Sequence, residues 1–182
     1  ADWLGVPRHT FSAVFGAVIA RGGDYREVFQ YFKPGFKLDE ARQERLDAGL
    51  GEYLNANDVY PDVRPCLKGL RDAQLFVGVA GNQTARAGRF LRELNLDVDV
   101  LATSDDWGVA KPSVEFFERL VHESGHEPEE IAYVGDRRDN DIAPAARAGL
   151  TTVLIQRGPW GLILPDIDPS WQADHVITSL LQ

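Results

Sequence analysis

The stretch YVGDRRDNDIAPAARAGL, residues 133–150, decides the fold class, because it joins a short apolar run to acidic residues and then to a helix of small residues. Asp136 directly follows the apolar run, and Asp139, Asn140 and Asp141 come next. Carboxylates crowded at the end of a buried strand repel one another unless a cation or a reaction uses them. The pattern therefore predicts a functional site at the end of a strand.

Apolar runs of strand length alternate with helical patterns on both sides of this stretch. We expect strands over residues 75–81, 98–104, 131–136 and 151–156, helices over 61–73, 84–95, 112–125 and 141–150, and a last short strand and helix within 173–181. This alternation predicts an α/β fold with a parallel sheet covered by helices on both faces.

The first third of the chain has no clear strand. Apolar residues at helical spacing predict helices over residues 10–22, 25–32 and 38–55, with glycine or proline after the first two. We therefore predict two parts, a small α-helical subdomain over residues 1–60 and an α/β core over residues 61–182.

The composition is that of an ordinary globular protein, with 182 residues, of which 44% are hydrophobic and 26% are charged. The net charge of −9 argues against a nucleic-acid partner and against an anionic membrane partner. No run approaches the ~20 apolar residues of a membrane span, and the N-terminus has no signal-peptide pattern. The single cysteine, Cys66, excludes an internal disulfide. We expect a cytoplasmic protein; composition does not indicate its oligomeric state.

Three segments are expected at one rim of the sheet, because ligands of parallel sheets bind beyond the carboxyl ends of the strands. VAGNQT supplies Gly81, Asn82 and free backbone N–H groups before a helix, which can bind an anion. GVAKPS places Lys111 just before a helix start, a combination that binds phosphate. VGDRRDND supplies Asp136 and further oxygen ligands of the kind that suits Mg²⁺. Each segment alone is common as a turn or a helix start, so the prediction depends on their order and shared rim.

In this order the segments resemble the motifs of the haloacid dehalogenase-like hydrolase superfamily, in a phosphatase-type member with a Rossmann-like fold and an α-helical cap. VAGN is similar to the second motif, GVAKP to the third and YVGDRRDND to the fourth. The resemblance implies Mg²⁺-dependent hydrolysis of a small phosphorylated metabolite. It implies that Lys111 stabilises the nucleophile and the phosphoryl oxygens and that Asp136 binds Mg²⁺. Asp141 or Asn140 would support the metal or the lysine.

Two departures from the family pattern matter. The second motif normally ends in Ser or Thr, whereas here Gly81 keeps the backbone donors for phosphate and lacks the hydroxyl, for which Asn82 substitutes in part. The first motif, a D-x-D at the end of the first strand, is absent from ADWLGVPRHTFS at residues 1–12. We therefore expect this chain to be inactive by itself.

The missing strand has a structural consequence. In the family it lies between the strands that end at Gly81 and Asp136, so its absence predicts a slot with unpaired backbone groups. The natural protein being longer, a gap in the sheet, and another segment filling the slot remain open as explanations.

Other segments could imitate a catalytic motif. Asp97 and Asp99 precede their strand, and Asp166 and Asp168 lie in a proline-flanked loop, so turn roles are favoured for both pairs. HESGH at residues 122–126 matches the H-E-x-x-H zinc pattern, but its glycine is expected to end the helix there.

Two competing functions remain. A non-catalytic phosphate- and metal-binding or interaction module is favoured by the missing nucleophile and by Gly81. A receiver-like or nucleotide-binding α/β domain shares the acidic rim but predicts no helical cap, so the helical first third argues against it.

Overall fold

The computed structural model describes residues 1–163 and 172–182, which form two compact units. A helical unit contains residues 1–52 and 158–163, and an α/β unit contains residues 53–157 and 172–182. Each unit is built around its own packed residues, and the two are described separately.

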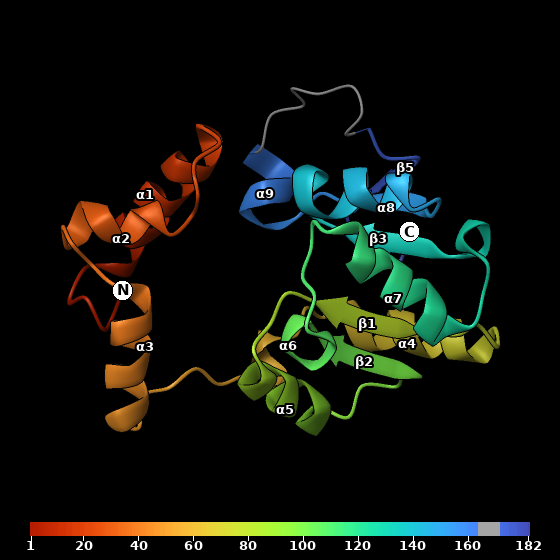
Figure 1. Cartoon of the computed structure of the whole chain (residues 1–182), viewed down its shortest axis with the longest axis horizontal. Helices are drawn as coiled ribbons and strands as arrows, with labels where there is room; N and C mark the ends of the chain where they lie inside the picture. The colour runs from red at the N-terminus through yellow and green to blue at the C-terminus, as the bar shows by residue number, and fades with distance from the viewer. Residues whose placement is uncertain (164–171) are drawn as a thin grey trace. The chain divides into compact units, whose positions relative to one another are not determined.

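The helical unit consists of α1 (Arg8–Ala20), α2 (Glu27–Phe32), α3 (Leu38–Asp47) and α9 (Gly158–Ile163) (Figure 1). Aromatic rings join α1 to α2 and to α9: Phe11 stacks on Phe32 with 5.7 Å between centroids, and Phe15 meets Trp160 edge-on at 5.6 Å. Val18, Ile19 and Val28 are fully buried beneath them. The packing of these rings and of the buried aliphatic side chains therefore stabilises the helical unit.

The predicted helix over residues 38–55 was too long. The helix ends at Asp47, Gly49 follows with φ +71°, and only a 3-10 turn, η1 (Ala56–Asp58), forms later. Glycine adopts the left-handed conformation that ends a helix because it has no Cβ to clash with the backbone. Gly49 therefore ends this helix before residues 50–55.

The α/β unit confirms the predicted alternation of helices and strands. In chain order it contains α4 (Val63–Asp72), β1 (Gly78–Gly81), α5 (Ala85–Glu93), β2 (Val100–Thr103), α6 (Ser104–Trp107), α7 (Val114–Ser124), η2 (Pro128–Glu130), β3 (Ala132–Gly135), η3 (Arg138–Ile142), α8 (Ala143–Arg147), β4 (Thr151–Ile155) and β5 (His175–Ile177). The predicted helix at the C-terminus is absent, since β5 is followed by turns in which the Gln182 side chain accepts from Thr178 N and Ser179 N.

All strand pairs are parallel, but the strands form two sheets rather than one. β1 pairs with β2, while β3, β4 and β5 form a second sheet in that order. Within residues 1–163 and 172–182, no segment pairs with the other edge of β1 or of β3. These are the strands that end at Gly81 and just before Asp136, so the structure has a gap where the sequence predicted a slot.

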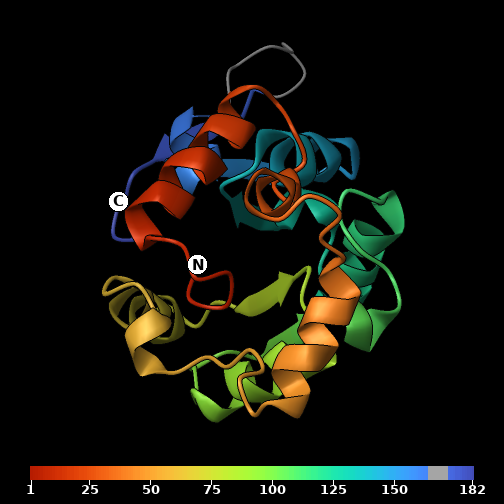
Figure 2. The ribbon, with the colours of Figure 1, turned by 90° about the vertical axis from the view of Figure 1, so that its left-hand side faces the viewer.

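Helices lie on both faces of the strands. α4 and α7 cover opposite faces of β1, as the two perpendicular views agree (Figures 1 and 2). Phe116 and Phe117 of α7 are fully buried and pack with Tyr133 of β3, while Ala80 of β1 contacts the same cluster. The α7 layer thus packs against strands of both sheets.

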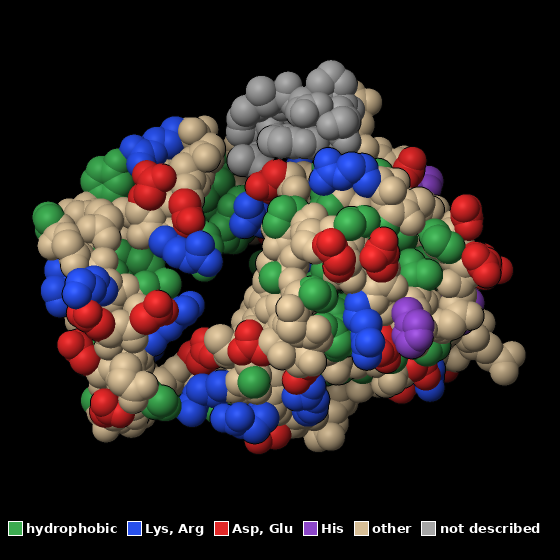
Figure 3. All heavy atoms as spheres, in the orientation of Figure 1, with side chains coloured by type: hydrophobic (Ala, Val, Ile, Leu, Met, Phe, Trp, Pro, Cys, Tyr) green, Lys and Arg blue, Asp and Glu red, His purple; other side chains and the backbone are tan. Residues whose placement is uncertain are grey.

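The surface mixes charges of both signs. Lys, Arg, Asp and Glu side chains are interspersed over the face seen in Figure 3. No helix in the described residues has the length and apolar character needed to cross a membrane.

Candidate active site

Asn82 fixes the backbone of Lys111. It directly follows β1, and its side-chain Oδ1 accepts from Lys111 N at 2.8 Å while its Nδ2 donates to Lys111 O at 2.8 Å. Both ends of the amide are therefore engaged, and the loop before α7 is held against the end of β1. Asn82, which the sequence suggested as a phosphate ligand, positions the lysine in this structure.

The side chain of Lys111 reaches the end of β3. Its Nζ donates to Asp141 Oδ1 at 2.5 Å and to the Tyr133 hydroxyl at 3.0 Å. The Lys111 and Asp141 side chains are only 11% and 4% exposed. Burial alone would lower the pKa of Lys111, but Tyr133 and Asp141 outweigh burial and raise it, so the ammonium stays charged.

Tyr133 is the site residue that the sequence reading missed. Burial raises the pKa of its hydroxyl to about 12, so the group remains neutral and can accept from Lys111. The available signal was a tyrosine inside a predicted buried strand, because a buried hydroxyl needs a hydrogen-bond partner.

Asp141 is held by two donors and by close packing. Besides Lys111, the backbone N–H of Arg137 donates to Asp141 Oδ2 at 3.0 Å. The π-helical turn η3 brings the carboxylate so close to Gly135 that a Cβ there would overlap the Asp141 side chain. Position 135 therefore requires glycine for the approach of Asp141 to the strand end.

Asp136 is half-buried and its carboxylate accepts no hydrogen bond from another residue in the described chain. Burial raises the pKa of this carboxyl, and the nearby charge of Asp141 raises it further. Asn140 is half-buried in η3, and its side chain likewise makes no hydrogen bond within residues 1–163 and 172–182. Asp136 is thus the acidic group with the most to gain from a bound cation.

Asp139 is engaged elsewhere. Its carboxylate forms a two-point ion pair with the half-buried Arg137, with Arg137 Nε 3.1 Å from Oδ1 and an Nη 2.7 Å from Oδ2. This pairing leaves Asp136 and Asp141 as the acidic groups that face Lys111.

The residues present fit Mg²⁺ in a limited sense. The described residues contain no cluster of three or more His, Cys, Asp or Glu side chains placed to hold a metal. Mg²⁺ needs only one or two protein carboxylates, since water and substrate oxygens complete its shell. The half-buried carboxylate of Asp136, beside Asp141, supplies that minimum.

The remaining candidates have structural explanations or stay open. Arg71 pairs with Asp99 at 2.7 Å and with Asp97 at 3.3 Å, and α7 ends at Ser124 before Gly125, so no helix continues through HESGH. A Cβ at Gly81 would meet no atom within 4 Å. Asp166 and Asp168 lie outside the described residues.

Comparison with known proteins gives a consistent result. A model of the haloacid dehalogenase-like hydrolase family matches residues 11–149. A glyceraldehyde 3-phosphate phosphatase from Methanopyrus kandleri is 36% identical over 64% of this chain and 52% of its own length. A ribulose-1,5-bisphosphate 5-phosphatase from Halopiger xanaduensis is 29% identical over 85% of this chain and 70% of its own length.

Solved structures agree with the sequence relatives. The crystal structure of an HAD phosphatase from Thermococcus onnurineus has a TM-score of 0.58 at 27% identity, and the match covers 96% of this chain and 76% of that one. The chain spans about half the length of the Methanopyrus relative. From the family match and these shared folds, the chain belongs to the haloacid dehalogenase-like hydrolase family.

Proposed function

We propose that the α/β unit is the phosphate- and metal-binding part of a Mg²⁺-dependent phosphatase that acts on small phosphorylated metabolites. The observation that carries this proposal is the buried Lys111 amine, held by Asp141 at 2.5 Å beside the unbonded carboxylate of Asp136. The phosphatase names of the two relatives support it.

Each group has a defined task in this proposal. Asp136 and Asp141 would hold Mg²⁺, which would supply positive charge to the phosphoryl oxygens. The Lys111 ammonium and the backbone N–H of Asn82 neutralise further negative charge as it moves during transfer, whereas the N–H of Gln83 already donates to Ser104 Oγ at 3.1 Å. Asn82 keeps the lysine in place through its two hydrogen bonds.

The nucleophile would be a carboxylate at the end of a strand between β1 and β3, as the family resemblance implies, on a segment outside the 182 residues. It attacks phosphorus, the ester P–O bond breaks, and the leaving alkoxide takes a proton from a neighbouring acid. Water then cleaves the acyl phosphate, releasing phosphate and restoring the carboxylate.

The first test uses the 182-residue chain. We expect calorimetry to show inorganic phosphate binding that requires Mg²⁺, and we expect no hydrolysis of 4-nitrophenyl phosphate. A folded chain that binds no phosphate in the presence of Mg²⁺ would contradict the proposal. Turnover that needs both Mg²⁺ and Asp136 would show that a carboxylate within the chain acts as nucleophile.

Asp136→Asn provides the specific variant. Phosphate binding should be lost, while stability should rise by about 1 kcal/mol, because a carboxylate kept for function is replaced by a neutral group. The sign follows from the raised pKa of Asp136: its ionised form is disfavoured in the folded state at neutral pH. Asp139→Asn is the matched control and should retain binding, since Arg137 already engages that carboxylate.

A second function is favoured by a specific observation. Gly81 offers no hydroxyl to a phosphoryl group, and β1 and β3 keep free edges within the described residues. A non-catalytic phosphate- and metal-binding module would account for both. A longer form of the protein that carries the D-x-D strand, binds phosphate with Mg²⁺ and hydrolyses no ester would support this alternative.

A further inference from the structure

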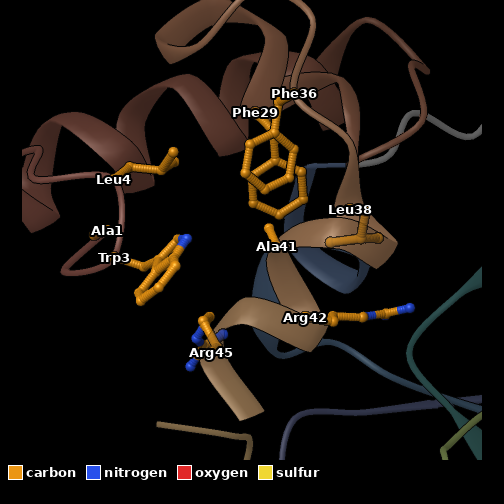
Figure 4. A pocket seen from close by; sticks show the side chains of 9 residues that line it. All are labelled: Ala1, Trp3, Leu4, Phe29, Phe36, Leu38, Ala41, Arg42 and Arg45. Carbon is orange, nitrogen blue, oxygen red and sulfur yellow. The ribbon is translucent and has the colours of Figure 1, made fainter. Parts of the chain in front are cut away.

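A pocket of about 80 Å³ lies within the helical unit and is formed by that unit alone (Figure 4). The residues that matter most for its chemistry come from the N-terminal turn, α2, the loop after α2, and α3: Trp3, Leu4, Phe29, Phe36, Ala41 and Arg45. None of them belongs to the candidate active site.

The walls of this pocket are flat and apolar. Phe29 and Phe36 stack with 4.7 Å between ring centroids and 26° between ring planes. Figure 4 shows Trp3 across the pocket from this ring pair, with Ala41 below the rings. Ala41 is 7% exposed, whereas Trp3 is 38% exposed. Surfaces of this kind favour a planar apolar group, because stacked or edge-on rings add to the gain from burial.

One wall carries an uncompensated positive charge. The other arginines of the helical unit pair with carboxylates: Arg8 with Asp2, Arg21 with Glu27, Arg26 with Asp24, and Arg42, which also lines the pocket, with Asp39. The half-buried guanidinium of Arg45 has no ion pair or hydrogen bond in the part of the chain that the structure describes. In Figure 4 it lies on the Trp3 side of the pocket.

We propose that this pocket binds a small aromatic carboxylate, with its ring between Trp3 and the Phe29–Phe36 pair and its carboxylate on Arg45. Guanidinium and carboxylate groups match in a two-point geometry that an apolar wall strengthens by excluding water. The pocket's size limits the ligand to about one ring, since sites for larger ligands are roughly 300–1,000 Å³.

The test uses the 182-residue chain labelled with ¹⁵N and benzoate as the probe. We expect a saturable shift of the Trp3 indole N–H signal, assigned by its loss in Trp3→Phe. Benzamide, of the same shape without the charge, should bind about tenfold more weakly, and acetate should cause no saturable shift. Equal binding of benzoate and benzamide, or no saturable shift with benzoate, would overturn the proposal.

Arg45→Gln should reduce benzoate affinity about tenfold, to the level of benzamide, and leave benzamide binding unchanged. Arg26→Gln is the matched control, since it removes the same charge from the same helical unit at a residue that does not line the pocket. The guanidinium of Arg26 pairs with Asp24 at 3.1 Å. An equal loss in both variants would show only a general charge effect and would contradict a carboxylate site at Arg45. Unchanged spectra elsewhere in each variant establish that it is folded.

Discussion

At the scale of single residues, the Lys111–Asp141 ion pair of the α/β unit is buried, so its charges affect the stability of that unit. Removing two charges from water is costly, and the pair persists because Tyr133 and the Arg137 N–H satisfy its remaining hydrogen bonds. Loss of one partner is therefore far more costly than loss of both.

We predict that Lys111→Met lowers the free energy of unfolding by about 3 kcal/mol, because Asp141 is left buried without its cation. Urea denaturation measures this change. Lys68→Met is the control and should cost less than about 0.5 kcal/mol, since Lys68 and Asp72 are 74% and 66% exposed. Adding Asp141→Asn to Lys111→Met should recover most of the loss. A cost no larger than that of the control would show that the pair is not stabilising in this way.

Gly81→Ser should strengthen Mg²⁺-dependent phosphate binding about tenfold, because it adds a hydroxyl donor for a charged group. The substitution is sterically free, since a Cβ at position 81 meets nothing within 4 Å. Gly78→Ser, equally open but at the start of the same strand, should leave affinity unchanged. Calorimetry compares the two, and a gain in neither variant would place the phosphate away from the end of β1.

The sequence could predict which residue types gather at the strand ends, but not all of their partners. Lys111 and Asp141 were expected at one rim, and the structure brings them together. The bond from Lys111 to Tyr133 and the bonds from Asn82 to Lys111 join residues 22 and 29 positions apart. Such contacts depend on how strands and loops meet in space, which local pattern does not encode.

At the scale of elements, apolar runs located the strands, while helix ends were harder to place. The helix that begins at Leu38 is shorter than predicted. Its polar pattern continues past Asp47, but Gly49 adopts a left-handed conformation that ends the helix. The C-terminal turns replace a predicted helix because Gln182 and Asp62 satisfy the backbone N–H groups of residues 178–180.

Asp62 joins three elements at the start of α4. Its carboxylate accepts from Arg157 at the end of β4, with distances of 2.8 and 3.0 Å, from Ser179 Oγ at 3.0 Å and from Leu180 N at 2.8 Å. Arg157 also lies 4.0 Å from the ring centroid of Tyr60. One carboxylate thus ties α4 to β4 and to the C-terminal turns.

This junction predicts a specific acid sensitivity. The Leu180 N–H first, and then Arg157 and Ser179, lower the pKa of Asp62 from 3.8 to about 2. Because the unfolded chain takes up the proton first, the stabilisation is present above about pH 4 and is lost as the pH falls toward 2. Asp62→Asn should therefore flatten the fall in stability between pH 4 and pH 2, measured by urea denaturation. The exposed Asp72→Asn should not, and an unchanged slope in Asp62→Asn would disprove the assignment.

At the scale of the whole molecule, the sequence predicted the α/β class, the parallel strands and the slot between β1 and β3. It did not predict that residues 158–163 pack with the helical unit. The contact of Trp160 in α9 with Phe15 in α1 joins residues far apart in the sequence, and a pattern within one segment cannot show it.

The divided sheet predicts uneven hydrogen exchange. β4 is paired on both sides, whereas β1 and β3 are each paired on one side in the described residues. Alternate amides of β1 and β3 should therefore exchange at least about 100-fold faster than those of β4, because they lack a cross-strand acceptor. Native-state exchange followed by NMR measures this difference. Equal protection in all three strands would mean that another chain, such as a second copy, covers the free edges.

Lys111 also connects the two sheets through its hydrogen bonds. Its backbone is fastened through Asn82 to the end of β1, and its amine is fastened to Tyr133 and Asp141 at the end of β3. The lysine therefore sets the distance between the ends of β1 and β3 as well as supplying charge. A shorter side chain at position 111 would allow the two strand ends to move relative to each other. Any activity lost on its replacement would therefore combine the effect of this movement with the effect of the missing charge. Lys111→Arg keeps the charge but changes the length and shape of the side chain. This substitution therefore separates the effect of charge from the effect of the distance between the strand ends.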